Sequence, residues 1–456
     1  MESQKKGYEI DMCSGPLFSK LVVFAIPLIL SGILQLLFNA ADIVVVGRYA
    51  GKESLAAVGS TSSLINLLVN VFIGLSVGAN VLVAQYFGAH RQKDLEDTVH
   101  TAMMLAVIGG VLLIAVGIAL ANPLLKLMGT PKDVLSLAVL YMQIFFVGMP
   151  ATLVYNFGSA VLRAVGDTRR PLYYLLLAGI VNVALNLFFV IRLHMGVAGV
   201  ALATVASQCI SAALILRCLM VSEAPYRLYL SRLRLVKAKV AAIARIGLPA
   251  GLQGTIFSIS NVLIQSSVNS FGPVAMAGNT AAANIEGFVY TSMNAVYQTA
   301  LSFTSQNFGA KNFKRMTKIE WYCQGIVIVI GLVMGIGAVM AGPQLLGIYS
   351  ADDAQVIQYG MDRLRLVCGP YFLCGMMEVM VGALRGIGCS LLPMFVSLTG
   401  ACAFRVVWIF TVFAVSHTLS SLYISYPVSW AITFLAHSAC YVGVRRRIAR
   451  KEGEKA

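Results

Sequence analysis

The sequence has few charged residues. Asp, Glu, Lys and Arg make up only 12% of its 456 residues, and acidic residues are the rarer class, with 19 Asp and Glu against 34 Lys and Arg. Soluble globular proteins carry about 25% charged residues. Hydrophobic residues account for 58% of the chain. The composition therefore excludes a soluble globular domain and indicates a polytopic membrane protein.

The sequence also lacks the motifs of several functional classes. Its five histidines and nine cysteines are dispersed, without the spacing of a metal site. It contains no glycine-rich phosphate-binding loop of the kind that binds ATP. No catalytic constellation or channel selectivity loop is visible, and no signal-peptide cleavage site follows the first apolar run. We therefore expect no enzyme, no ATP-driven pump and no cofactor.

Twelve apolar segments follow one another along the chain. Open strands would leave backbone groups without hydrogen bonds in lipid, and a transmembrane barrel would show short alternating segments, so the segments are interpreted as helices. They cover residues 21–46, 55–85, 99–121, 134–161, 171–191, 197–220, 246–270, 276–305, 320–342, 356–384, 394–415 and 422–444. The sequence thus predicts an all-α polytopic membrane protein with twelve transmembrane helices.

The basic residues are distributed unevenly between the loops. An N-terminus in the cytoplasm places most of the 34 Lys and Arg on the cytoplasmic side, above all in the segment 221–245 and in the tail 445–456. This is the pattern of the positive-inside rule, and it predicts a multi-pass protein of the cell (inner) membrane with both termini cytoplasmic. The tail "RRRIARK" is interpreted as an anchor at an anionic leaflet, so no nucleic-acid partner is expected.

The two halves of the chain repeat one another. Three pairs of segments align at a nearly constant offset of 221 or 222 residues: "AIPLILSGILQLLFN" (25–39) with "GLPAGLQGTIFSISN" (247–261), "AQYFGA" (84–89) with "SQNFGA" (305–310), and "LRAVGDTRRP" (162–171) with "LRGIGCSLLP" (384–393). Each half contains six spans, so both enter the membrane in the same direction. The sequence predicts two parallel-repeat six-helix bundles, the arrangement of some secondary transporters.

This repeat defines the expected domain organisation. We predict a cytoplasmic N-terminal segment (1–20), an N-terminal six-helix lobe (21–220), a basic cytoplasmic linker (221–245), a C-terminal six-helix lobe (246–444) and a basic cytoplasmic tail (445–456). In transporters of this kind the substrate site lies near the middle of the membrane, between the repeats.

Acidic residues inside the spans are the strongest functional candidates. Only Asp42, Glu286 and Glu378 lie well inside apolar segments. A carboxylate in the middle of a membrane helix costs roughly 2.5–3.5 kcal/mol on insertion scales, so its presence calls for a partner or a function. Gln35 and Asn39 precede Asp42 at spacings that place all three on one helix face. This polar face is expected to point towards protein or water rather than lipid.

Polar residues of the fifth and sixth spans complete a candidate site with Asp42. Asn182 and Asn186 are four residues apart on one face of the fifth span, and Thr204 lies on the sixth. Carboxylate, amide and hydroxyl oxygens are the donors that a small cation such as Na⁺ uses. The same groups could hold a protonated carboxyl, or could serve only as hydrogen bonds between helices. The residues leave these alternatives open.

The second half repeats the amide stripe without its acid. Asn261 and Gln265 lie on the seventh span; together with Gln35, Asn39, Glu286 and Glu378 they are expected to line a substrate cavity. Arg405 lies inside the eleventh span. A buried Glu378–Arg405 ion pair is predicted as the simplest neutralisation, with either a structural or a mechanistic role.

These residues resemble the multidrug and toxic compound extrusion (MATE) transporters of prokaryotes over roughly residues 17–444. The resemblance rests on five stretches taken together: "AADIVVVGRYAGKESLAAVG", "LRAVGDTRRP", "NVALN", "GVAGVALATVAS" and "ALRGIGCSLLP". It implies two six-helix lobes around a V-shaped cavity. It also implies a secondary antiporter that exports small organic cations in exchange for sodium ions or protons. We expect such a transporter to act as a monomer in the bilayer.

The resemblance also assigns roles to individual residues. Asp42 matches the family's first-span acid, and Asn182 and Thr204 match polar members of the same site. Asn186 departs from the family pattern, because many prokaryotic relatives have aspartate there. The acidic seventh-span residue of another branch is also absent. The cation-coupling site is therefore expected at Asp42, Asn182, Asn186 and Thr204, with Asp42 as the only deep acid of its lobe.

A flippase for lipids or lipid-linked oligosaccharides, from the same superfamily, is the alternative function. Such proteins often line their cavity with basic residues that bind a pyrophosphate. Here the charges recognised inside the spans are the three acids and Arg405. This balance favours a cationic cargo.

Overall fold

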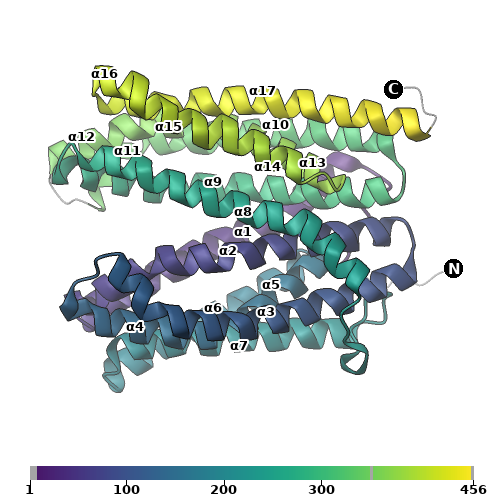
Figure 1. Ribbon diagram of the computed structural model, residues 1–456, viewed down its shortest axis with the longest axis horizontal. Helices are drawn as coiled ribbons and strands as arrows, with labels where there is room; N and C mark the ends of the chain where they lie inside the picture. The colour runs from purple at the N-terminus through teal and green to yellow at the C-terminus, as the bar shows by residue number, and fades with distance from the viewer. Residues whose placement is uncertain (1–7, 350–352, 453–456) are drawn as a thin grey trace. The chain divides into compact units, whose positions relative to one another are not determined.

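The computed structural model describes residues 8–349 and 353–452. This part of the chain is almost entirely helical and contains no β-strand. Figure 1 shows the helices as long rods joined by short connections. The predicted all-α architecture is confirmed.

A helical segment corresponds to each of the six spans predicted in the first half. These segments are α1 (Leu17–Tyr49), α2 (Lys52–Gly88), α3 (Gln92–Leu127), α4 (Lys132–Val147) with α5 (Met149–Ala164), α6 (Arg169–Leu187) with the π-helix η1 (Phe188–Arg192), and α7 (Gly196–Val221). A short 3₁₀-helix, η2 (Leu230–Arg232), lies in the linker that follows.

The second half follows the same order. Its segments are α8 (Lys237–Asn269), α9 (Pro273–Gly309), α10 (Phe313–Met340) with the short α11 (Gly342–Gly347), α12 (Ala354–Arg363) with the π-helix η3 (Leu364–Cys368) and α13 (Phe372–Gly386), α14 (Leu391–Ser397) with η4 (Leu398–Ala403), α15 (Phe404–Trp408), η5 (Ile409–Phe413) and α16 (Ala414–Ser416), and α17 (Leu419–Glu452). Both η4 and η5 are π-helices.

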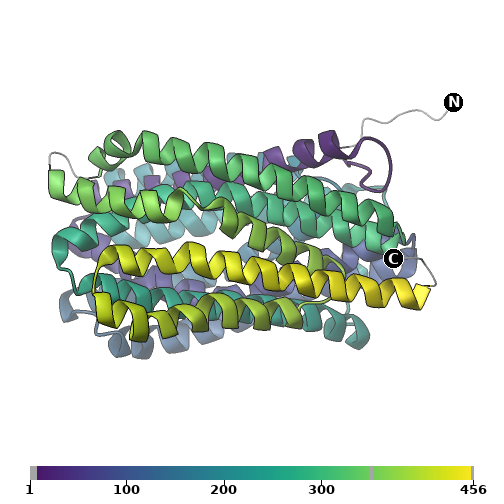
Figure 2. The ribbon, with the colours of Figure 1, turned by 90° about the horizontal axis from the view of Figure 1, so that it is seen from above.

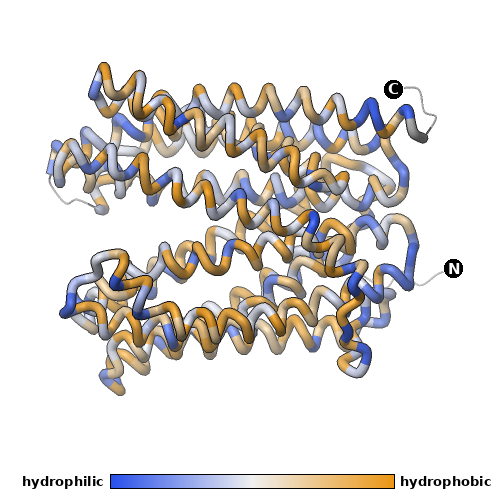
Figure 3. Tube along the Cα trace, in the orientation of Figure 1, coloured by the Kyte–Doolittle hydropathy of each residue, from blue (hydrophilic) through white to orange (hydrophobic). Residues whose placement is uncertain are grey.

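Length and hydropathy support most of these spans independently. In the described residues, nine helices are long and apolar enough to cross a membrane, and two bent helix pairs bring the number to eleven. The twelfth predicted span is α9, which is 37 residues long but more polar. Its polar side chains, among them Asn279, Glu286 and Gln306, are buried inside the protein rather than exposed to lipid. Figure 3 shows hydrophilic residues gathered towards the helix ends and loops.

Two predicted spans are bent rather than straight. The fourth span bends by 48° between α4 and α5, and the tenth by 43° between α12 and α13. The first bend lies at Gly148, two residues before Pro150, and the second lies at Gly369 and Pro370. Proline removes one backbone hydrogen bond and its ring clashes with the preceding turn, which accounts for both bends.

The chain divides into two compact units. Unit 1 comprises residues 1–12 and 30–252, and unit 2 comprises residues 13–29 and 253–456. Helices α1 and α8 therefore each contribute residues to both units. The candidate site lies in unit 1, so its packing is described first.

Glycines bring α2 and α8 into close contact within unit 1. A Cβ atom at Gly74 would lie 2.3 Å from the backbone nitrogen of Gly251, and one at Gly78 would lie 2.4 Å from the carbonyl oxygen of Ile243. Only glycine leaves room for two backbones at this separation. Gly247 belongs to the same contact, since its Cβ would lie 2.6 Å from the Cα of Leu75.

The basic linker packs on the end of α3. Three ion pairs hold it there: Lys239 with Asp94 at 2.6 Å, Arg232 with Glu96 at 2.8 Å, and Arg234 with Asp97 at 2.6 Å. The backbone N–H of Tyr229 also donates to Nε2 of His100 at 3.0 Å. The linker is therefore an ordered part of unit 1.

In unit 2, α9 packs against α10, α12 and α13, and α17 packs against α13. Figure 2 shows α17 running beside the segment from α14 to α16. A buried cluster that includes Phe313, Met316, Met380, Leu384 and Tyr441 joins α10, α13 and α17.

Candidate functional site

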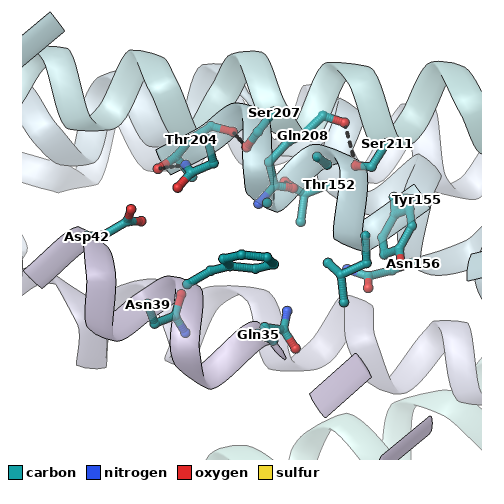
Figure 4. A pocket seen from close by; sticks show the side chains of 15 residues that line it. Gln35, Asn39, Asp42, Thr152, Tyr155, Asn156, Thr204, Ser207, Gln208 and Ser211 are labelled. Atoms are coloured by element: carbon teal, nitrogen blue, oxygen red, sulfur yellow. Dashed lines mark hydrogen bonds between the residues drawn. The ribbon is translucent and has the colours of Figure 1, made fainter. Parts of the chain in front are cut away.

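A polar cavity of about 120 Å³ lies inside unit 1. Gln35, Asn39 and Asp42 line it from α1, as their spacing predicts. Residues of α5, α6 and α7 form the remaining walls (Figure 4). The polar face of α1 thus points into a cavity within the protein.

A chain of hydrogen bonds joins Asp42 to the predicted polar residues of α6 and α7. Nδ2 of Asn186 donates to the Asp42 carboxylate and also lies 3.4 Å from Oδ1 of Asn182. Nδ2 of Asn182 in turn donates to the Thr204 hydroxyl at 3.4 Å. The structure therefore brings together all four residues of the predicted cation-coupling site.

Burial differs along this chain of residues. Asn186 and Asn182 are buried, whereas Asp42 and Thr204 are only partly buried and line the cavity. Oδ1 of Asn186 is also buried and accepts no hydrogen bond from any described residue. A buried amide oxygen without a donor is unfavourable. Oδ1 of Asn186, beside the carboxylate of Asp42, is therefore available to accept a hydrogen bond or to bind a small cation.

Sequence reasoning missed part of the cavity wall. Thr152, Tyr155 and Asn156 line it from α5, and Ser207, Gln208 and Ser211 line it from α7. The Thr152 hydroxyl donates to Oε1 of Gln208, which joins the two walls. The sequence contained the signal for these residues. On α5, the other two follow Thr152 by three and four residues, and on α7 the three follow Thr204 by three, four and seven residues, which places each set on one helix face.

The side chains that line the cavity carry negative charge only. Asp42 is its single acidic residue, and none of its lining residues is basic. Within the described chain, no Lys, Arg or His lies at ion-pair distance from Asp42. The site thus presents an uncompensated carboxylate with amide and hydroxyl oxygens around it. This chemistry suits a positively charged ligand.

The predicted residues of the second half lie in unit 2 and belong to a different arrangement. Glu286 forms a buried ion pair with Arg363, and Asn279 accepts from Arg363 Nη1 at 2.7 Å. Gln265 Oε1 accepts from Asn279 at 2.8 Å, which adds one predicted residue to this network. Asn261 is exposed and Glu378 is partly buried.

The predicted Glu378–Arg405 ion pair is not formed among the described residues. Arg405 instead donates from Nε to the Ser429 hydroxyl at 2.9 Å, and its guanidinium carbon lies 4.2 Å from the centre of the Tyr426 ring. The prediction considered only acids as partners, but aromatic faces also stabilise a cation.

The ion pair between Glu286 and Arg363 also changes the balance of acidic and basic residues inside the spans. Arg363 lies within the predicted tenth span, but the sequence analysis did not include it. It could have been found in the same way as Arg405, because each is an arginine inside a predicted span. The spans therefore contain at least two arginines. A cationic cargo is therefore inferred from the lining of the cavity in unit 1, and not from the number of charged residues in all the spans.

Among the described residues, no group of three or more His, Cys, Asp or Glu could hold a metal ion. A cation bound at Asp42 would instead be held by one carboxylate with neutral oxygens from Asn182, Asn186 and Thr204. Such a donor set fits a weakly held monovalent ion better than a resident divalent metal.

Comparison with known proteins identifies similar sequences and folds. A model of the MatE family matches residues 27–188 and again residues 249–411, at equivalent positions of the internal repeat. The probable multidrug resistance protein YoeA of Bacillus subtilis is 26% identical over 424 residues, covering 91% of either chain. The FAD transporter of Shewanella oneidensis is 25% identical over 358 residues, covering 76% of this chain and 77% of that protein.

A solved structure of a multidrug resistance MATE family transporter in an outward-facing conformation has a similar fold. Its TM-score is 0.89 with 22% sequence identity, and the match covers 95% of this chain and 98% of that one. The expected twelve-helix arrangement thus agrees with a known fold over nearly the whole chain.

Proposed function

Because this chain belongs to the MatE family of multi-pass membrane transporters, we propose that it is a secondary antiporter that exports small organic cations. The coupling ion is a proton or a sodium ion, and the site of coupling is the cluster of Asp42, Asn182, Asn186 and Thr204. The protein acts as a single chain in the cell membrane, with both termini in the cytoplasm and two six-helix lobes that alternate in access.

One observation carries this proposal. The carboxylate of Asp42 lines a cavity and accepts a hydrogen bond from Asn186 on another helix, and no basic residue of the described chain forms an ion pair with it. A carboxylate without a counter-ion in a membrane protein favours the uptake of a cation. A proton or a sodium ion supplies the missing positive charge. Oδ1 of Asn186 also supports the uptake of a cation, since it belongs to the same cluster and accepts no hydrogen bond from the described residues.

The hydrogen bond between Asp42 and Asn186 provides a link between occupancy and conformation. It joins α1 to α6 across the cavity. A cation on the carboxylate competes with the amide N–H for the same oxygens, so the bond weakens when the site is occupied. An ion can drive a conformational change only through different affinities for two states. The hydrogen bond between Asp42 and Asn186 can make the affinity of the site for the ion differ between the two conformations.

The cavity lining supports a cationic cargo. It combines one acid with amides, hydroxyls and the aromatic side chains of Phe38 and Tyr155, and it contains no basic residue. Aromatic faces and carboxylates are the groups that bind organic cations. A lipid or lipid-linked oligosaccharide flippase is the alternative, but a pyrophosphate would need basic partners that this cavity does not provide.

Efflux from proteoliposomes tests the proposal. The purified protein is reconstituted, and export of a fluorescent organic cation is followed under an imposed proton gradient, an imposed sodium gradient or neither. We expect export with one of the two gradients and none without a gradient. Parallel vesicles contain FAD, the cargo named for the Shewanella relative. Export of FAD but not of the organic cation would overturn the cationic assignment.

A further inference from the structure

Arg405 is a buried cation that has no acidic partner among the residues that the structure describes. Its side chain is only 3% exposed, and no carboxylate of the described residues forms an ion pair with it. Nε donates to Ser429, and the guanidinium carbon lies 4.2 Å from the centre of the Tyr426 ring and 5.6 Å from that of Trp430. Nη2 is buried and donates to none of the described residues. A charge held in this way needs an explanation beyond packing.

The internal repeat shows which position of unit 1 corresponds to Arg405. Pro171 and Pro393 align at the offset of 222 residues. The π-helix η4 then follows in the second half only, and a π turn contains one residue more than an α turn. From Ala401, inside η4, onwards the buried residues therefore align at an offset of 223. The pairs are Ala178 with Ala401, Gly179 with Cys402, Asn182 with Arg405, and Val190 with Phe413.

Contacts between helices support this register. In unit 1, Gly179 lies against the ring of Phe38, and in unit 2 the corresponding Cys402 lies beside Ser260, the counterpart of Phe38.

The contacts of the two site residues also correspond. Asn182 bonds to Thr204, and Arg405 packs on Tyr426, which is 222 residues after Thr204. Ser429, which accepts from Arg405, likewise corresponds to Ser207 of the cavity wall. Arg405 thus lies in unit 2 at the place that Asn182 occupies in unit 1.

The charges at these two corresponding places are opposite. Unit 1 has the carboxylate of Asp42, whereas the corresponding residue of unit 2 is the buried Ile264. Unit 2 has instead a guanidinium beside two aromatic rings and a hydroxyl. These are groups that bind a desolvated cation. An arginine side chain keeps its charge under all physiological conditions.

We propose that Arg405 is a tethered cation: its guanidinium permanently fills the site in unit 2 that corresponds to the cation site of unit 1. Unit 2 consequently takes up no mobile coupling cation, and ion coupling is confined to unit 1. This inference deepens the proposed function and rests on it for the role of Asp42. The occupancy of the site in unit 2 can be tested without transport.

The test uses guanidinium as a soluble replacement for the removed group. Arg405→Ala leaves a space of guanidinium shape between Tyr426, Trp430 and Ser429. Low millimolar guanidinium chloride, far below denaturing concentration, is expected to raise the Tm of Arg405→Ala. Two controls accompany it. Arg405→Met fills the same space with an apolar side chain, and urea has the same planar shape without the charge.

The expected result is a shift in Tm that requires both the space and the charge. Guanidinium should stabilise Arg405→Ala more than Arg405→Met or the unaltered protein, and urea should stabilise none of them. Equal shifts for the two variants, or for guanidinium and urea, would overturn the proposal, because Arg405 would then be only a packing residue.

A second comparison applies if Arg405→Ala does not fold. Arg405→Lys keeps a positive charge at the site, whereas Arg405→Gln keeps polarity without charge. The Lys variant should retain a higher Tm and a higher export rate than the Gln variant, and equal values would contradict the proposal. Asp42→Asn should leave the guanidinium response of Arg405→Ala unchanged. Failure at Asp42 and failure at Arg405 are thus distinguishable.

Discussion

Arg363 binds Glu286 through two parallel hydrogen bonds inside unit 2. Nε lies 2.9 Å from Oε1 and Nη2 lies 2.8 Å from Oε2, and both side chains are buried. Arg363 is the last residue of α12, directly before the π-helix η3, and Glu286 lies on α9. The pair therefore fixes the end of a bent span to its neighbouring helix.

Removal of one partner of this pair should destabilise the protein strongly. Arg363→Met leaves an uncompensated carboxylate in the interior, which typically costs about 3–5 kcal/mol. The double variant Arg363→Met with Glu286→Met should recover most of this loss, because no buried charge remains. Thermal unfolding in detergent measures both effects. Arg365→Met, two residues away and exposed, is the matched control and should change Tm little. Strictly additive losses in the double variant would show that the two residues do not act as a pair.

Asp42→Asn should abolish gradient-driven export and leave the protein folded. The amide keeps the size of the side chain and can still bond to Asn186, but it takes up no proton and binds sodium weakly. Removal of a carboxylate from a membrane helix also lowers the cost of insertion, so Tm should be unchanged or higher. Export rates at matched expression decide the question, with Asp133→Asn, an exposed acid of α4, as the control. Export at the normal rate by Asp42→Asn would refute the coupling role.

Gly179→Ala should disturb the cavity wall. A Cβ atom at Gly179 would lie 1.8 Å from the ring of Phe38, so the ring must move within the cavity. Overpacking of this kind typically costs about 1–3 kcal/mol. The export rate should fall together with Tm. At Gly59 in α2 nothing lies within 4 Å of the added atom, so Gly59→Ala should stabilise its helix by about 0.5–1 kcal/mol. Equal Tm values for the two variants would contradict the close contact between α1 and α6 at Phe38.

The linker should open locally when its ion pairs are removed. Arg232→Gln combined with Arg234→Gln eliminates two solvent-exposed ion pairs, which contribute little to global stability. Amide hydrogen exchange over residues 230–236 should become faster, while the global Tm changes little because Lys239 still binds Asp94. High salt should produce the same effect in the unaltered protein. Arg245→Gln, an exposed substitution in α8, serves as the control. Unchanged exchange in the double variant would indicate that the backbone contacts alone hold the linker.

Hydropathy and spacing predicted the fold and part of the site. Apolar runs identified all twelve helical segments, because a membrane span must be long and apolar to satisfy its backbone in lipid. The spacing of Gln35, Asn39 and Asp42 predicted a common polar face, and the structure places all three in one cavity. These features depend on local periodicity, which a sequence records directly.

Partners between distant helices could not be predicted in the same way. Glu286 and Arg363 are far apart in the chain, and nothing in their spacing indicates that α9 and α12 are neighbours. The aromatic partners of Arg405 were missed because Tyr426 and Trp430 resemble ordinary apolar residues of a span. The π-helices add a further difficulty, since each shifts the helical register by one residue.

The π-helix η4 has a consequence for how two copies of one fold can diverge. An added residue in an α-helix turns every later side chain by about 100° around the axis, which would carry polar groups of a membrane span towards lipid. In η4 the extra residue is absorbed within one wide turn, and the buried face continues from Ala401 and Cys402 of η4 to Arg405 of α15. A duplicated lobe can therefore gain a residue in mid-membrane without exposing its polar face, and its interior can change charge while its helices stay in place.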